Sequence, residues 1–473
     1  MASLSPRGRA TRRALLVFAS IALEAAVALA QDIPAPQPGA PVDVGEKEKN
    51  VPDSELPWLD PSAPDYRTPL AGEGFRTRIF GRDVTVHQRD RRSTTAWDLG
   101  VATWDRWPED ERLLPFGAIY FFRRPNEQSF LRGDVVGIYN DVVYAHSLGP
   151  STPFEGVLGF QSQTVPTDSA QWVDGERIKR QELFKGNIRG SIGIGYRRQV
   201  EPGFSGLRFH EGVDPQAPDN MFSVSATIEP EFLYFRRGKD DPSDFNVPSD
   251  TLQLRGHLQL RWDALQRNVL DLAHRGWAVG LDGTQGWRES WHDWGIDSSE
   301  QAGDGRLPRL LQGYAFVATG VPGVESERHR LIGSFHGGVG GNLDRFSAPS
   351  VGGGPSGDEF LTLARPLVPG SAIGEYWPDH YAIGLLEYRY ELFFFTYLSA
   401  RASVSWLDRD RFHNEDESQV HRENNTLTSL GARLTTGFLF SSRLQVDYNY
   451  NFDVIRNGHD GANEIVLHVS RSF

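Results

Sequence analysis

The sequence predicts an all-β fold, namely a transmembrane antiparallel β-barrel of the outer membrane with about 16 strands. Three observations carry this prediction: long segments of alternating apolar and polar residues, an N-terminal export signal, and the absence of cysteine. Successive residues of a strand point to opposite faces, so a two-residue period separates an apolar face from a polar one. Such alternation here runs about as far as the ~9 to 11 residues with which a tilted strand crosses a bilayer.

The N-terminus is typical of a secretory signal peptide, which we assign to residues 1–30. Arg12 and Arg13 lie in a basic region, residues 14–23 are apolar, and an A-x-A cleavage site ends at Ala30. The adjacent arginines leave a twin-arginine signal as an alternative. No later stretch is apolar for the 18 or more residues of a membrane-spanning helix, so export leads to the periplasm, the outer membrane or the medium.

Composition excludes several classes of site and partner. Without cysteine, neither a disulfide framework nor a thiolate metal site can form. The formal net charge is -13, which argues against a nucleic-acid partner. The stability of the exported chain must therefore come from packing and backbone pairing.

Two segments of different composition lie between the signal peptide and the predicted strands. Residues 31–70 are rich in proline and predict an extended periplasmic linker. Residues 71–95 form a short segment of uncertain structure before the barrel, which we assign to residues 96–473.

Five segments show the alternation most clearly, in chain order 97–101, 184–196, 222–228, 252–262 and 443–453. In the last of these, Leu444, Val446 and Tyr448 alternate with polar residues. A soluble β-sandwich or propeller also alternates, but ordinary strands average only ~5 to 6 residues. Two aromatic clusters at expected strand ends predict the interfacial girdles of a membrane barrel: Phe393, Phe394, Phe395 and Tyr397, and Trp287, Trp291 and Trp294.

The last strand ends the chain on an aromatic residue. Ile465, Leu467, Val469 and Phe473 share one face of the segment EIVLHVSRSF. This ending resembles the signal that outer-membrane barrels present to the barrel-insertion machinery during biogenesis. Arg471 interrupts the apolar face.

Three stretches resemble the bacterial surface antigen superfamily, which includes outer-membrane protein assembly factors and two-partner secretion pores. They are the strand, turn and strand over residues 252–287, the Gly-Gly signature with its loop and next strand over 344–395, and the ending VLHVSRSF. The resemblance covers about Thr251 to Phe473. It implies an outer-membrane barrel that inserts or translocates proteins or lipids, or forms a pore.

The resemblance also implies a lock inside the lumen. In the family, an arginine on the loop after the paired glycines pairs with an acidic residue of the wall. Here Arg365 takes the arginine's place, with Glu387 or Glu391 as the partner. The family's arginine-glycine step is missing, because Pro366 follows, so an ordinary solvated loop arginine is the alternative. The matching Gly-Gly turn consists of Gly352, Gly353 and Gly354.

A second departure concerns the region before the barrel. Family members that handle proteins carry periplasmic polypeptide-transport-associated domains there, and residues 31 to about 95 are too short and too rich in proline for one. This puts assembly or secretion in doubt and leaves a general diffusion porin, or a surface-exposed structural or adhesive barrel, as alternatives.

The sequence predicts no enzyme, no catalytic residues, no cofactor and no metal. H-E-x-x-H, G-x-S-x-G and P-loop motifs are absent, and the glycines around Ser356 have the wrong spacing for a nucleophile loop. Acidic loop clusters at Asp240 and Glu415 could hold Ca²⁺ or bridge lipopolysaccharide, or could simply be solvated. The expected partners are outer-membrane lipid and lipopolysaccharide, the insertion machinery, and a protein or lipid client.

Overall fold

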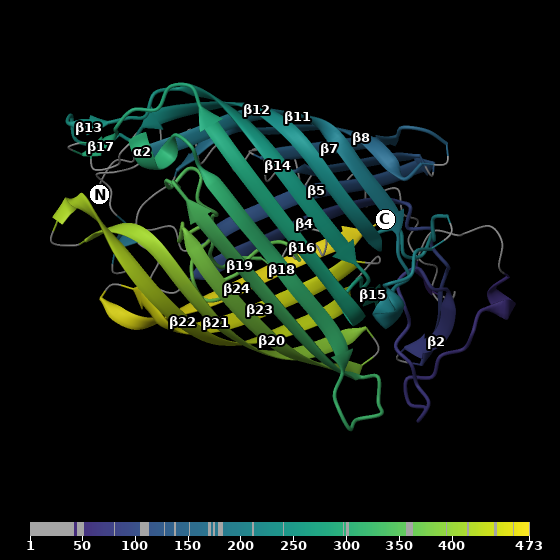
Figure 1. The fold of residues 1–473 in the computed structure, drawn as a ribbon. Coiled ribbons are helices and arrows are strands. Elements are labelled where there is room, and N and C mark those ends of the chain that lie inside the picture. Colours follow the sequence, from purple (N-terminus) through teal and green to yellow (C-terminus); the bar gives the residue numbers. More distant parts are fainter. Residues whose placement is uncertain are drawn as a thin grey trace.

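The predicted fold class is confirmed: a computed structural model shows a closed antiparallel β-barrel of 16 strands, of the outer-membrane type (Figure 1). The predicted signal peptide at residues 1–30 lies outside the described residues. The structure describes residues 42–44, 52–79, 81–104, 113–126, 128–136, 139–150, 152–168, 172–173, 176–177, 183–210, 212–239, 241–296, 298, 302–355, 363–393, 395–413, 416–438, 442–456 and 458–472.

The wall of the barrel consists of long strands that follow one another in chain order. They are β4 (Ser93–Trp104), β5 (Leu114–Asn126), β6 (Ser129–Val135), β7 (Asn140–Ser147), β8 (Phe154–Asp168), β11 (Leu183–Gln199), β12 (Met221–Arg237), β14 (Thr251–Asp263), β16 (Ala273–Arg288), β18 (Arg309–Gly320), β19 (His329–Gly341), β20 (His380–Phe393), β21 (Thr396–His413), β22 (Asp416–Phe438), β23 (Ser442–Arg456) and β24 (His459–Ser472).

Every strand of the wall pairs antiparallel with its neighbours in sequence, and the last strand closes on the first. The closing register runs from Glu464 opposite Trp104 to Ser472 opposite Ala96. The short strand β15 (Gln266–Arg267) continues the pairing with β16 after β14 ends. Because the sheet is closed, the backbone N–H and C=O groups of every wall strand can form hydrogen bonds within the sheet. A bilayer requires this, since lipid offers them no hydrogen-bond partners.

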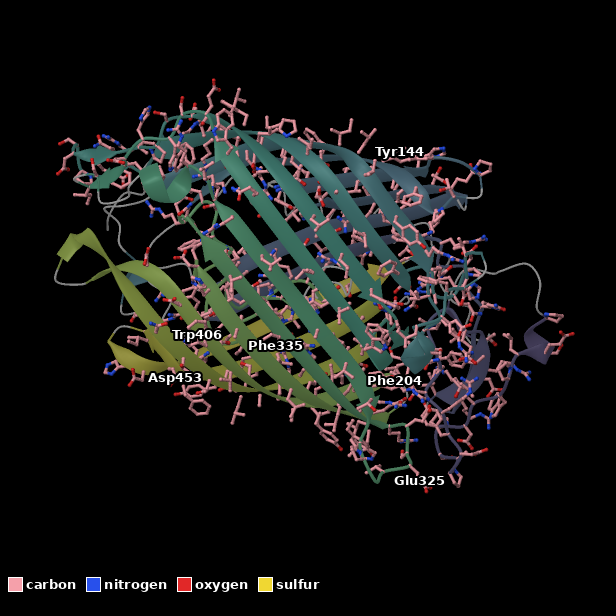
Figure 2. The ribbon with its side chains drawn as sticks, in the orientation of Figure 1. Tyr144, Phe204, Glu325, Phe335, Trp406 and Asp453 are labelled. Atoms are coloured by element: carbon pink, nitrogen blue, oxygen red, sulfur yellow. The ribbon has the colours of Figure 1, made fainter. Side chains whose placement is uncertain are left out.

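The alternation predicted from sequence places apolar residues outside and polar residues inside. On β23, Tyr448 and Phe452 are 44% and 46% exposed, whereas Asp447 and Asn449 are 2% and 4% exposed. Phe335 and Trp406 likewise lie on the outer wall, as Figure 2 shows. A soluble barrel would reverse this arrangement, so the outer face suits lipid and the inner face a polar lumen.

Small elements gather at the two ends of the barrel. At the end where β24 finishes lies a sheet of β1 (Val42–Val44), β3 (Arg82–Val86) and β2 (Phe75–Ile79), in that order (Figure 1). At the opposite end lie β13 (Phe245–Asn246), β17 (Gly295–Ile296) and α2 (Ala302–Gly305). The remaining short elements are η1 (Asp53–Glu55), η3 (Gly203–Ser205), β9 (Trp172–Val173) and β10 (Glu176–Arg177).

Among the described residues, no helix has the length and apolar character needed to span a membrane.

The aromatic clusters differ in part from the predicted girdles. Trp287 is exposed on the outer wall, but Trp291 and Trp294 are buried with Phe235 and Phe346 in a core at the end of the barrel that carries β13. Their sequence spacing was misleading because the chain has left β16 at Arg288 and turned inward. A row of neighbouring rings instead follows the strand ends nearest the C-terminus: Tyr196, Phe222, Trp262 and Trp277.

The predicted barrel boundary at residue 96 falls within β4, which begins at Ser93. The described part of the region before it, residues 52–79 and 81–92, is called the N-terminal segment below.

Candidate functional site

The connection between β19 and β20, residues 342–379, folds into the barrel; we call it the lumenal loop. Its described parts are residues 342–355 and 363–379. Val351, Val368 and Tyr376 of the loop are buried in one apolar cluster with inward residues of five wall strands. The wall residues of this cluster are Tyr381, Ile383, Leu407, Leu427, Val454 and Ala462. Burying these side chains drives the loop against the β20 to β24 side of the wall.

A buried ion pair fastens the loop to the end of β23. The Glu375 carboxylate accepts hydrogen bonds of 2.7 and 2.5 Å from the two terminal nitrogens of Arg456. The two side chains are only 4% and 1% exposed. Burial alone would raise the pKa of Glu375, but Arg456 and the backbone N–H of Ala372 outweigh it and hold the pKa below its ordinary value.

A second fastening comes from Glu464 on β24. Its carboxylate accepts the backbone N–H groups of Gly354 and Gly370 in the loop, the latter at 2.9 Å. Asn449 and Trp104 donate to the same carboxylate from neighbouring strands. Glu464 therefore bridges the loop to the seam at which β24 closes on β4.

Glycines allow the loop to approach the wall this closely. Gly370 has φ of +86°, and a Cβ built on it would lie 2.6 Å from Cβ of Asn451 on β23. Asn451 in turn donates to the Pro369 carbonyl at 2.9 Å. The predicted Gly-Gly turn also lies in this region, where Gly352 pairs with Leu367 and Gly354 has φ of +99°.

An ion pair also holds the start of the loop. Arg288 at the end of β16 donates to the Asp344 carboxylate at 2.5 Å, and both side chains are buried. Arg288 also stacks on the Trp291 ring at 4.0 Å. The lumenal loop is thus attached to opposite sides of the wall, to β16 at its start and to β23 and β24 further along.

The structure places Arg365 and Glu387 in the lining of the same cavity, but without an ion pair between them. Arg365 donates to the carbonyl oxygens of Gly353 and Pro355, both at 3.2 Å. Glu387 is instead held by Arg389 at 2.9 Å, with Arg401 and Arg433 within 3.8 Å. The family-like pairing of Arg365 with the wall stays a prediction.

Glu391, the other predicted partner, faces the N-terminal segment. Its carboxylate accepts hydrogen bonds from the Tyr66 hydroxyl at 2.6 Å and from the Thr68 hydroxyl at 2.7 Å. Leu70 also pairs with Asn268 in the turn before β16. The N-terminal segment therefore packs against the barrel at the end nearest the C-terminus.

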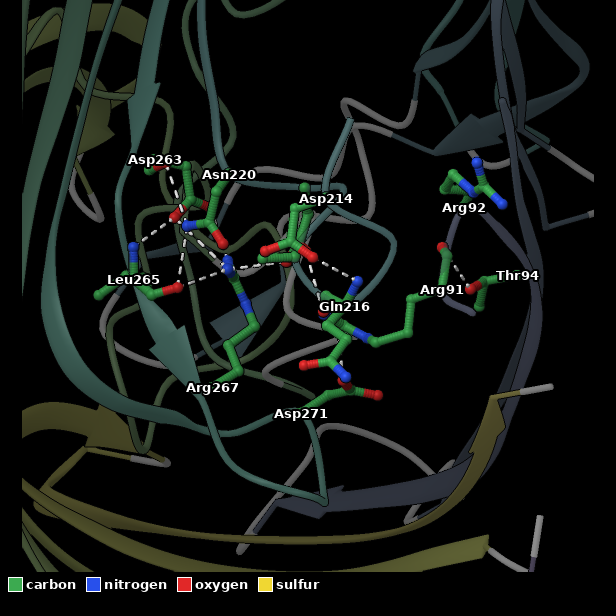
Figure 3. Close-up of polar contacts among 12 residues, drawn as sticks. Arg91, Arg92, Thr94, Asp214, Gln216, Asn220, Asp263, Leu265, Arg267 and Asp271 are labelled. Carbon is green, nitrogen blue, oxygen red and sulfur yellow. Dashed lines mark hydrogen bonds and ion pairs between the residues drawn. The ribbon is translucent and has the colours of Figure 1, made fainter. Parts of the chain in front are cut away.

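A charge network ties the same segment to two further connections of the barrel (Figure 3). Arg91 donates to Asp219 at 3.1 Å and to Asp271 at 2.7 Å. Arg267 pairs with Asp219 at 2.7 Å and with Asp263 at 2.6 Å. Burial alone would raise the pKa of Asp271, but Arg91 and nearby arginines hold it below its ordinary value.

Of the predicted C-terminal signal, Ile465 and Leu467 are exposed on the outer face of β24 and Val469 is half-buried there. Phe473 lies outside the described residues, as do Ser356, Asp240 and Glu415. Within the described part of the chain, no three acidic or histidine side chains are grouped closely enough to hold a metal.

Sequence reasoning missed the residues that fasten the loop. Glu375, Arg456 and Glu464 are separated in sequence, and each looks like an ordinary charged residue in a polar stretch. One signal was present for Glu464, because a carboxylate at an inward position of a lumen-lining strand needs hydrogen-bond donors. Its donors on the loop could not be identified without the fold.

Comparisons with known proteins give likenesses in fold at low identity. A scan against protein-family models found no match, and a search of curated proteins found none. BamA from Haemophilus ducreyi lacking POTRA domains 1-3 has a TM-score of 0.47 at 10% identity, over 85% of this chain and 75% of that chain. CdiB from Escherichia coli has a TM-score of 0.45 at 11% identity, over 87% of this chain and 68% of that chain. OpdN from Pseudomonas aeruginosa has a TM-score of 0.33 at 10% identity, over 81% of this chain and 99% of that chain.

Proposed function

We propose that this protein is an outer-membrane barrel whose lumen is obstructed at rest and that acts in the insertion or translocation of proteins or lipids. The observation that carries the proposal is the lumenal loop, fastened to the wall by the Glu375–Arg456 pair and by Glu464. Membrane barrels include open, water-filled channels and barrels whose lumen is plugged by a loop or a helix, and a loop fastened at several points suits the second kind. A barrel that opens for a client needs a stable resting state.

The N-terminal segment supports the same proposal from the other side. We infer that the end of the barrel nearest the C-terminus faces the periplasm, because both ends of the barrel sequence meet there. Tyr66 and Thr68 contact Glu391, and Arg91 contacts Asp219 and Asp271, at this end. The segment is thus placed to respond to a periplasmic client or partner, although it is shorter than a transport-associated domain.

The competing function is a diffusion porin, and the charged inner face favours it. Arginines and carboxylates line the wall on all sides of the lumen, as in a water-filled channel. The two functions differ in what the cell loses when the protein is removed.

The test is a depletion strain in which the abundance of other outer-membrane barrels, surface lipids and the uptake of a small hydrophilic solute are followed together. The proposal predicts a fall in other barrels or in surface lipids, with solute uptake unchanged until the membrane itself fails. Unchanged barrels and lipids with slower uptake would refute it and establish a diffusion pore. Re-expression of the wild-type chain is the control.

A further inference from the structure

The outer wall of the barrel is hollowed over the neighbouring strands β12, β14, β16, β18 and β19, which lie side by side in Figure 1. The hollow has a volume of about 640 Å³, and we call it the wall hollow. Small residues form its floor, namely Ala226, Gly256 and Gly283 on three successive strands. The sheet surface is low there because these positions carry a methyl group or no side chain at all.

Large apolar side chains border this floor. Leu258, Leu311 and Val339 line the wall hollow and are exposed on the outer face of the barrel. They share one row across the sheet with Gly283, which pairs with Leu258 on one side and with Leu311 on the other. The wall hollow therefore lies on the lipid-facing side, and its walls and floor suit a hydrocarbon chain.

An arginine lines the same hollow. The adjoining row of the sheet, nearer the end that carries β13, contains Gly256, Gln285, Arg309 and Gly341 in pairing order. Arg309 is exposed on the outer wall and lines the wall hollow. Its guanidinium lies over Gly341, where a built Cβ would be 2.6 Å from Nε of Arg309. The row thus places one positive charge at the edge of an apolar hollow.

Arg309 has no partner of its own in the protein. Among the residues that the structure describes, its side chain forms no ion pair and no hydrogen bond. Exposed apolar residues flank it along the chain, Leu307 before it and Leu311 after it, and Trp287 is exposed two residues beyond Gln285. A charge on the lipid face of a barrel is destabilising unless it lies at the interface or is compensated. An anionic group of the surrounding lipid is the available compensation.

The chemistry of the two features identifies this lipid. Guanidinium groups bind phosphate through paired, charge-assisted hydrogen bonds. Arg309 follows α2, at the end of the barrel opposite to the C-terminus, which faces outward in the orientation inferred above. The outward leaflet of an outer membrane consists of lipopolysaccharide, whose lipid A anchor carries phosphates on its head and several acyl chains below them.

We propose that the wall hollow is a binding site for one molecule of lipid A, the membrane anchor of lipopolysaccharide. Arg309 binds a phosphate of the head, and one acyl chain lies over Gly256 and Gly283 between the flanking leucines. The inference goes beyond the proposed function, since a diffusion pore with the same outer wall would bind the same lipid.

The experiment measures lipid binding by native mass spectrometry of the full-length protein, released from a neutral maltoside detergent. The probes, titrated separately, are diphosphoryl lipid A, synthetic lipid A without phosphates, and phosphatidylglycerol. Arg309→Gln removes the charge, and its matched control is Arg236→Gln, which removes an exposed arginine near the same end of the barrel, on β12.

A second pair of variants tests the acyl chain. Gly256→Leu fills the wall hollow, and a Cβ built on Gly256 meets no atom within 4 Å, so the leucine has room. Gly190→Leu is its control, because Gly190 on β11 has the same open surroundings but lies outside the hollow. Circular dichroism verifies that every variant is folded.

We expect diphosphoryl lipid A to bind the wild type, Arg236→Gln and Gly190→Leu equally. Arg309→Gln should bind it about 10- to 100-fold more weakly, the effect of losing a charge-assisted hydrogen bond. The same substitution should leave the binding of lipid A without phosphates unchanged. Gly256→Leu should weaken the binding of both forms of lipid A, because it occupies the place of the acyl chain.

Equal binding of diphosphoryl lipid A by the wild type and Arg309→Gln would overturn the proposal, as would an equal loss in Arg236→Gln. Unchanged binding in Gly256→Leu would overturn the placement of the acyl chain. Phosphatidylglycerol that binds as tightly as diphosphoryl lipid A would overturn the assignment to lipopolysaccharide. These outcomes are independent of the depletion strain, so failure here is distinguishable from failure of the proposed function.

Discussion

The Glu375–Arg456 pair gives the sharpest prediction, because it is a buried link between the lumenal loop and the wall in which both carboxylate oxygens accept from one guanidinium group. In Glu375→Gln the side chain keeps its size but loses its charge. The buried guanidinium group of Arg456 then keeps one amide oxygen and the Ile455 carbonyl as acceptors, but no carboxylate balances its charge. Removing one partner of a buried ion pair costs about 3 to 5 kcal/mol. At about 1.4 kcal/mol for each factor of ten, the undocked fraction of the loop rises roughly 100- to 4000-fold.

The undocked fraction of the loop can be measured with a single introduced thiol, because the chain has no cysteine. Ser371 is fully buried in the loop, so Ser371→Cys places the only thiol where a maleimide reaches it after undocking. When the loop reopens and closes faster than the reagent reacts, the labelling rate follows the open population. We expect Glu375→Gln to accelerate labelling by at least a hundredfold, and Glu325→Gln, in an exposed connection (Figure 2), to leave it unchanged. Equal rates for Glu375→Gln and the parent would refute the assigned role of the pair.

Two further predictions concern the contacts of the lumenal loop, and a third concerns the N-terminal segment. Gly370→Ala should undock the loop, because φ of +86° and the approach of Asn451 leave no room for a methyl group. Gly384→Ala is the control, since a methyl group there meets open space. The thiol-labelling rates of the two variants test this difference. Because the pKa of Glu375 is lowered, its stabilisation of the docked loop is complete above the ordinary glutamate value near 4.5 and is lost as pH falls through the lowered value. Bilayer conductance should therefore contain a component that rises only as pH falls below about 4.5, and Glu375→Gln should lack that component. Tyr66→Phe leaves one carboxylate oxygen of buried Glu391 without its hydrogen-bond donor, which costs about 1 to 3 kcal/mol. Proteolysis of the N-terminal segment should therefore be faster in the variant. A proteolysis rate equal to that of the parent would contradict this.

The barrel could be predicted from sequence because its main signal is local. The alternation of Leu444, Val446 and Tyr448 with polar residues depends on the strand period alone, and β23 places them as expected. A period does not report where a strand stops. Trp291 and Trp294 were therefore expected in an interfacial girdle, although the chain beyond Arg288 turns into a buried core.

The loop contacts could not be predicted because they depend on distant residues. Arg365 and Glu387 were singled out by resemblance, and the structure does place both beside one cavity. Their individual partners are decided by the depth to which the loop enters and by the arginines that neighbouring strands bring to Glu387. Glu375 meets Arg456 across 81 residues of sequence, and no spacing rule connects them.

The central claim is that the docked lumenal loop obstructs the lumen at rest. The most direct measurement is single-channel conductance in planar bilayers of the wild type and of a variant in which a short Gly-Ser linker replaces residues 345–378. The account predicts rare, small openings in the wild type and a large steady conductance in the variant. A wild type that conducts as steadily and as strongly as the loop-deleted variant would contradict it.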